Sequence, residues 1–180
     1  IIQAAQGLAL KSSHQQFAPE HILKALLDDE TGLAGNLIQA AGGRLRQVQD
    51  AVDQALDALP KVEGGQGKLY LAPQTAKVFG AADDAAKRAG DQFVSAERIL
   101  QAISLNPDNK AYDALKAAGV TPQALNTAIN DLRAGRTADT GHRRLCRSGR
   151  GLEPECDDDK LLPDCQILWY VVMLKFILFV

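Results

Sequence analysis

Cysteine, tryptophan and methionine are absent from residues 1–140 of this 180-residue chain. Without cysteine, this segment forms no disulfide and no thiolate-ligated metal site, so it gives no sign of an oxidising compartment. The formal net charge is −2 and no long basic stripe occurs, which argues against a nucleic-acid partner. The chain also lacks an apolar run of about 20 residues, so we expect no membrane-spanning helix and no membrane partner.

One phrase occurs twice in the chain. The first copy, QFAPEHILKAL, spans residues 16–26, and the second, DQFVSAERILQAI, spans residues 91–103. Matching residues lie 76 positions apart at first and 77 positions apart from Glu20 onward. A single change of offset over about sixty residues predicts two copies of one structural unit.

Residues 1–59 form the first copy, and the spacing of their apolar residues predicts four helices. The first helix covers about 1–12, and the second opens at Pro19, because proline is favoured in the first turn of a helix. The third is expected to stop at Gly42, since glycine readily adopts the left-handed conformation that ends helices. The fourth ends at Pro60.

Residues 73–135 repeat this pattern and form the second copy. Pro73 opens the first helix, and Ser95 is the expected N-cap of the second. Gly119 ends the third helix. Thr121 caps the fourth helix and is followed by a first-turn proline.

We therefore predict an all-α fold in which two four-helix repeats, related by a pseudo-twofold axis, pack as one globular domain. A unit of roughly sixty residues has a thin core of its own, whereas two units can share one. Their junction is expected to leave a groove, lined by Leu, Val, Phe and Ala, for an apolar segment of another chain. The linker, 60–72, contains GGQGK, which lacks the spacing of a phosphate-binding loop, and no stretch predicts a strand.

Six phrases, in order and correctly spaced, resemble the N-terminal (Clp repeat) domain of the ClpB disaggregases, which are AAA+ chaperones. They are FAPEHILKALLDDETGLAGNLI, LPKVEGG, AGDQFVSAERIL, ALKAAGVTPQALNTAI, LRAGRTADT and the doubled unit itself. The resemblance covers about 1–140. It implies a mobile helical module above a homohexameric ATPase ring. Such a module engages unfolded or aggregated protein and passes it to the ring's pore, in the cytoplasm and together with the DnaK system during stress recovery.

Two departures from the family limit what this chain does alone. About a dozen residues of the family's start have no counterpart, so we interpret Ile1 as the edge of a fragment. No Walker motif occurs, so we expect no enzyme activity and no cofactor in this chain; ATP and Mg belong to ATPase modules outside it.

The resemblance also implies three substrate-engagement residues. Asp91 and Glu97 match acidic positions that couple substrate engagement to the ring, and Phe79 matches an apolar groove position. Each has a structural alternative. Glu97 would stabilise the first turn of a helix, Asp91 would shape the turn at Gly90, and Phe79 would pack in the core.

Four further aromatic residues are expected to have no functional role. Phe17 and Phe93 occupy equivalent positions in the two repeats, and we predict that both are buried anchors. His14 and His21 lack a nearby nucleophile or a metal-ligand spacing, so we place both on the surface.

Composition changes abruptly after Thr140, and we interpret 141–180 as a tail foreign to the family, frameshifted or derived from a junction, and disordered or poorly packed. Its Cys146, Cys156 and Cys165 could be offered with His142 as a zinc site. The spacing has no short Cys-x-x-Cys pair, so the signal is weak. The apolar run that ends the tail is too short to span a membrane and is an aggregation hazard.

Three functional hypotheses follow. The leading one is a non-catalytic module that captures unfolded protein for a disaggregase. The second keeps the fold and makes it the adaptor-binding N-terminal domain of a Clp protease ATPase of the ClpA or ClpC type. The third is a small enzyme that uses the cysteines of the tail.

Overall fold

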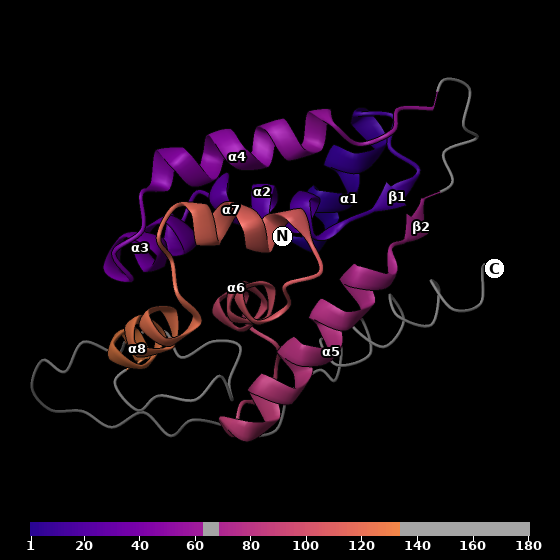
Figure 1. The fold of residues 1–180 in the computed structure, drawn as a ribbon. Helices are drawn as coiled ribbons and strands as arrows, with labels where there is room; N and C mark the ends of the chain where they lie inside the picture. The colour runs from indigo at the N-terminus through magenta and orange to yellow at the C-terminus, as the bar shows by residue number, and fades with distance from the viewer. Residues whose placement is uncertain (63–68, 134–180) are drawn as a thin grey trace, which may run out of the picture. The chain divides into compact units, whose positions relative to one another are not determined.

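The structure, a computed structural model, describes residues 1–62 and 69–133, and this part of the chain is almost entirely helical (Figure 1). The predicted all-α fold is confirmed. In chain order the elements are α1 (Ile2–Lys11), β1 (Gln16–Phe17), α2 (Pro19–Leu27), α3 (Leu33–Ala40), α4 (Leu45–Asp57), β2 (Tyr70–Leu71), α5 (Pro73–Arg88), α6 (Ala96–Leu105), α7 (Lys110–Ala117) and α8 (Pro122–Arg133).

The helix boundaries follow local sequence signals. Pro19, Pro73 and Pro122 each occupy the first position of a helix, where the missing N–H costs nothing. Gly42 and Gly119, which are repeat equivalents, follow α3 and α7 with φ of 82° and 87°. These left-handed conformations end the helices in the same way in both copies.

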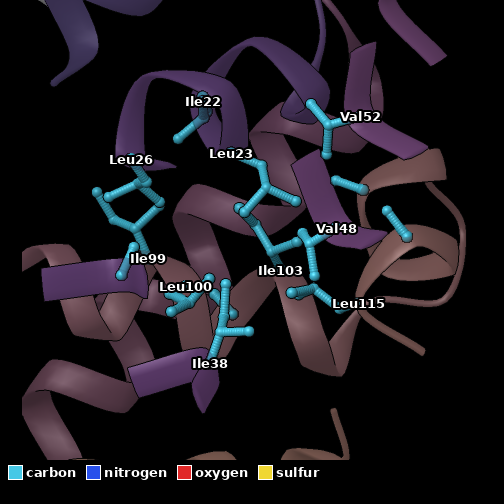
Figure 2. Close-up of a cluster of buried hydrophobic side chains, with 14 of the residues drawn as sticks. Ile22, Leu23, Leu26, Ile38, Val48, Val52, Ile99, Leu100, Ile103 and Leu115 are labelled. Carbon is cyan, nitrogen blue, oxygen red and sulfur yellow. The ribbon is translucent and has the colours of Figure 1, made fainter. Parts of the chain in front are cut away.

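The core is shared by both repeats. Figure 2 shows Leu23 of α2 and Ile103 of α6 at the centre, with side chains from α4 and α7 closing over them. Every helix from α1 to α8 contributes buried apolar side chains to this core. Across the repeats α2 packs on α6, α3 on α8 and α4 on α7. Exchanging the two repeats converts the α3–α8 pair into the α7–α4 pair, as a pseudo-twofold relation requires.

The two repeats are in close contact at Gly43 and Val120, which are equivalent positions. The backbone N–H of Arg44 donates to the carbonyl oxygen of Ala118 at 3.2 Å. A Cβ atom on Gly43 would overlap the buried Val120 side chain and lie 3.0 Å from the Ile38 carbonyl oxygen. One repeat therefore carries glycine where the other carries valine.

Replacing Gly43 by alanine is expected to destabilise the domain by about 1–3 kcal/mol, because the added methyl overpacks this contact. Urea denaturation of the chain measures the change. Gly80→Ala is the matched control: Gly80 lies in the interior of α5, and nothing lies within 4 Å of an added Cβ. It should stabilise the chain by up to about 1 kcal/mol, since alanine is the better helix former. Equal effects at both positions would contradict this account.

A short segment after α1 is held by both ends of the inter-repeat linker. His14 pairs with Lys61 in an antiparallel bridge, and β1 pairs with β2 in parallel. Beyond the strands, the hydroxyl of Thr75 donates to the carbonyl oxygen of Phe17 at 2.7 Å. The expectation of no strands is therefore wrong for β1 and β2, two-residue strands whose partners lie far apart in the sequence.

The histidines of this segment are buried, which corrects their predicted surface position. His14 and His21 are 4% and 0% exposed, and His14 Nδ1 lies 2.8 Å from His21 Nε2. The Ala18 N–H donates to His21 Nδ1, so this side chain also caps α2. Loss of hydration on burial lowers the pKa of both histidines, that of His21 to about 4.

The two equivalent phenylalanines also differ. Phe17 is 1% exposed, as predicted, and stacks on His21. Phe93 is 36% exposed, so its predicted burial is wrong. Phe17 belongs to β1, and its side chain joins the buried core, whereas Phe93 lies in the loop before α6 and outside the described strands.

The buried histidines predict that the domain loses stability in mild acid. The unfolded state takes up a proton on His21 near pH 6.5, and the folded state does so only near pH 4. Neutral His21 therefore makes its full contribution to the free energy of unfolding above about pH 6.5. That contribution, about 3 kcal/mol, is lost as the pH falls toward 4. Urea denaturation between pH 7 and pH 4 measures this slope. His21→Gln keeps an acceptor for the Ala18 N–H and should flatten the slope; an unchanged slope would contradict the assignment.

Candidate functional site

The structure brings Asp91 and Glu97 together on one arginine that the sequence did not indicate. Arg133, in the last turn of α8, bonds Asp91 through Nη1, which lies 2.6 Å from both Oδ1 and Oδ2. Its Nη2 donates to Glu97 Oε1 at 2.8 Å and to the Ser95 hydroxyl at 2.7 Å. Arg98 Nε donates to Asp91 Oδ2 at 3.0 Å. We call these five residues the Arg133 cluster.

Local structure positions the acidic members of the cluster. Gly90, with φ of 72°, turns the chain after α5, and the Asp91 N–H donates to the Ala86 carbonyl oxygen at 2.9 Å. Asp91 therefore does occupy the turn at Gly90. Ser95 stands at the predicted N-cap of α6, but its hydroxyl accepts a hydrogen bond from Arg133 rather than from the helix backbone.

The cluster is buried and its formal charges balance. The Asp91 side chain is fully buried, and two carboxylates face two guanidinium groups. Burial would lower the pKa of Arg133, but the hydrogen bonds with Asp91 and Glu97 outweigh it and raise that pKa. Because arginine then stays protonated, the cluster holds elements together and does not exchange protons.

The repeat equivalent of Glu97 plays a different part. Glu20 is buried, and its Oε1 accepts the N–H groups of Lys110 at 2.8 Å and Ala111 at 3.2 Å. Glu20 thus caps α7 of the other repeat, where a carboxylate stabilises the helix N-terminus. The doubled sequence marked Glu20 and Glu97 as a pair but gave no sign that their partners differ.

Phe79 lies apart from the cluster. Its side chain is partly buried and packs against the core from α5, as the structural alternative expects. It is absent from the lining of the groove between the repeats. Its role in substrate engagement stays a prediction.

An apolar groove lies at the junction of the repeats, between α3 and α8. Both helices lie on the left in Figure 1. The groove has a volume of about 620 Å³ and is lined mainly by leucine and alanine: Leu33, Leu37, Ala40 and Ala41 on one side, and Ala124, Ala128 and Leu132 on the other. Asn36, Thr127 and Asp131 add polar groups to its rim.

A second cavity, of about 430 Å³, lies among α5, α6 and α8 and is more polar. Carboxamide side chains and Arg88 line it, and Gln101 Nε2 donates to Asn126 Oδ1 at 2.8 Å across its floor. Among the residues that line this cavity, Leu105 is the large apolar one. The two cavities therefore suit chemically different ligands.

The described ranges, 1–62 and 69–133, contain neither a candidate metal site nor a helix that could span a membrane. Within them no group of three or more His, Cys, Asp or Glu side chains could hold a metal ion. The helices of the same ranges are too short or too polar to cross a membrane. The tail, with the candidate zinc ligands Cys146, Cys156, Cys165 and His142, lies outside the described residues, and predictions about it stay predictions.

Comparison with known protein families matches residues 1–118 to the Clp repeat (R) N-terminal domain. The chain belongs to this family. Relatives of the Clp repeat chain include the chaperone protein ClpB of Mesorhizobium japonicum, 58% identical over 140 residues, which are 78% of this chain. The ClpB of Rhodopseudomonas palustris is 52% identical over 91% of the chain. The matched segments are only 16% and 19% of these two relatives, so the chain spans less than a fifth of their length.

A solved structure supports the fold of this Clp repeat domain. The N-terminal domain of Hsp104 from Candida albicans superimposes with a TM-score of 0.69 at 22% identity. The match covers 77% of this chain and 90% of the Hsp104 domain. At this identity the likeness concerns the fold alone.

Asp91→Asn is expected to destabilise the domain by about 3–5 kcal/mol, because it leaves Arg98 and Arg133 buried without a full countercharge. Thermal or urea denaturation measures the loss. Asp84→Asn, on the exposed face of α5, removes the same charge and should change stability by no more than about 0.5 kcal/mol. A small effect of Asp91→Asn would show that the cluster contributes little to folding.

Proposed function

We propose that this chain is the substrate-engaging N-terminal module of an ATP-dependent disaggregase, and that it binds unfolded or aggregated protein in the apolar groove between α3 and α8. The groove itself carries the proposal: it lies where the repeats meet, and leucine and alanine dominate its walls. The names of the ClpB relatives, which are chaperones, support the class of function.

The groove favours weak and unselective capture. An apolar side chain that becomes fully buried contributes about 1.5–3 kcal/mol, and ordering of the bound segment offsets part of this. Alanines leave the walls smooth, so side chains of different shape fit. In a homohexamer, six tethered copies would raise the effective concentration of sites without tight individual binding.

The rest of the machinery lies outside this chain. We propose that ATP and Mg act in ATPase modules, that the captured segment passes to a ring of six subunits, and that the DnaK system cooperates in the cytoplasm. Asp91 and Glu97 are the proposed coupling residues, because the cluster joins the loop after α5 to the end of α8. Phe79 would support engagement by holding α5 on the core.

The polar cavity favours the second candidate, an adaptor-binding domain of a Clp protease ATPase. Carboxamides and Arg88 around this cavity can form hydrogen bonds with the folded surface of a protein partner. A substitution at each cavity separates the two candidates.

Leu132→Ser should weaken binding of a permanently unfolded protein, such as reduced and carboxymethylated α-lactalbumin, by about five- to tenfold. Leu132 is 44% exposed on the wall of the groove, and bound substrate would bury the remainder. Fluorescence anisotropy of the labelled unfolded protein measures the dissociation constant. Leu105→Ser is the matched control, because Leu105 is 49% exposed beside the polar cavity.

The control variant should bind as the unchanged chain does. Weaker binding by Leu105→Ser alone would move the site to the polar cavity. Binding of folded adaptors in preference to the unfolded protein would favour the adaptor-binding function. No binding of unfolded protein by the unchanged chain would refute the proposed function.

A further inference from the structure

The Arg133 cluster stands at one end of the apolar groove. Asp131 and Leu132 line the groove, and Arg133, the next residue of α8, belongs to the cluster. On the other side, Glu97 shares a small cavity with Leu33, Leu37 and other residues near the start of α3. The cluster therefore joins the end of one groove wall to α6, and α6 packs against α3, the other wall.

The equivalent place in the other repeat is closed differently. Leu56 of α4 is the repeat equivalent of Arg133, and it is buried with the apolar core. There α4 packs on α7, and Glu20 caps the N-terminus of α7. Glu97, by contrast, accepts hydrogen bonds from Arg133 Nε at 3.0 Å and Nη2 at 2.8 Å. Apolar packing of Leu56 therefore helps to close the α4–α7 pair. In the α3–α8 pair, hydrogen bonds of Arg133 hold the end of α8 instead.

We propose that Arg133 is a positioning residue for substrate binding: its bonds to Asp91, Ser95 and Glu97 fix the last turn of α8 and thereby set the width of the α3–α8 groove. This inference rests on the proposed function of that groove. Directional, charge-assisted hydrogen bonds hold a helix in one geometry, whereas apolar packing at the same position would fix no single geometry. Arg133 thus keeps the groove open and of constant shape.

Methyl NMR of the full chain, labelled on isoleucine, leucine and valine, tests the position of α8 without any ligand. In Arg133→Gln we expect the methyl resonances of Leu33, Leu37 and Leu132, on both groove walls, to shift. Those of Val48 and Leu115, in the α4–α7 pair, should stay in place. Asp91→Asn should shift the same groove resonances, because it removes the negative charge and one of the two oxygens that accept from Arg133.

Binding of the unfolded α-lactalbumin supplies the second readout. Arg133→Gln should weaken it about tenfold under conditions where every variant is folded. Arg46→Gln removes the same charge from the exposed face of α4 and should have no effect. Leu56→Ala lowers stability at the equivalent position of the other repeat and should leave the dissociation constant unchanged.

Arg133→Lys keeps the charge, but its ammonium carries all its donors on one nitrogen and lacks the planar fork with which the guanidinium bonds Asp91, Ser95 and Glu97. We expect it to shift the same resonances by less, which provides a second variant if Arg133→Gln does not fold.

The inference would be overturned by groove resonances that stay in place in both Arg133 variants, by shifts spread equally over the whole core, or by binding that Leu56→Ala weakens as much as Arg133→Gln. Shifted groove resonances with unchanged binding would also overturn it. If the unchanged chain binds no unfolded protein, the proposed function fails by itself, and the NMR comparison still decides whether Arg133 sets the groove width.

Discussion

Burial of one apolar core by two short repeats is the constraint on which the rest of this structure depends. The apolar stripes of α2 and α6 face each other, and each supplies the surface that the other needs (Figure 2). A single unit of roughly sixty residues would leave much of this surface in water. The remaining helices of the described residues pack around the α2–α6 pair in symmetric combinations, among them α3 with α8 and α4 with α7.

The features of the proposed site occur where the two copies differ. Gly43 and Val120 are equivalent, yet only glycine fits on one side of the axis. Glu20 caps a helix of the other repeat, whereas Glu97 binds Arg133. Beside these differences, α4 packs on α7, and a groove lies between α3 and α8. Duplication thus accounts for the symmetric arrangement of the helices, and single-residue differences between the copies distinguish the α3–α8 pair from the α4–α7 pair.

Local signals made most of the fold predictable from sequence. First-turn prolines, the glycines after α3 and α7 and the cap at Thr121, whose hydroxyl accepts the Ala124 N–H, all act within one helical turn. Arg133 could not be predicted in this way, because its carboxylate partner Asp91 lies 42 residues away. The burial of His14 was missed for a similar reason: it depends on backbone pairing with the distant Lys61. The acidic residues were found through the family resemblance, and the cation that joins them was not.

The pairing of residues 13–17 with both ends of the inter-repeat linker affects how the chain folds during synthesis on the ribosome. These residues gain their partners only when Lys61, Tyr70 and Thr75 have been made, and Glu20 reaches its partners only at Lys110. An emerging first repeat therefore cannot reach its final state alone and must wait for the second. Such dependence on late contacts slows folding and leaves apolar helices exposed in the meantime. During synthesis the apolar helices of the first repeat would therefore be prone to aggregation until the second repeat has folded.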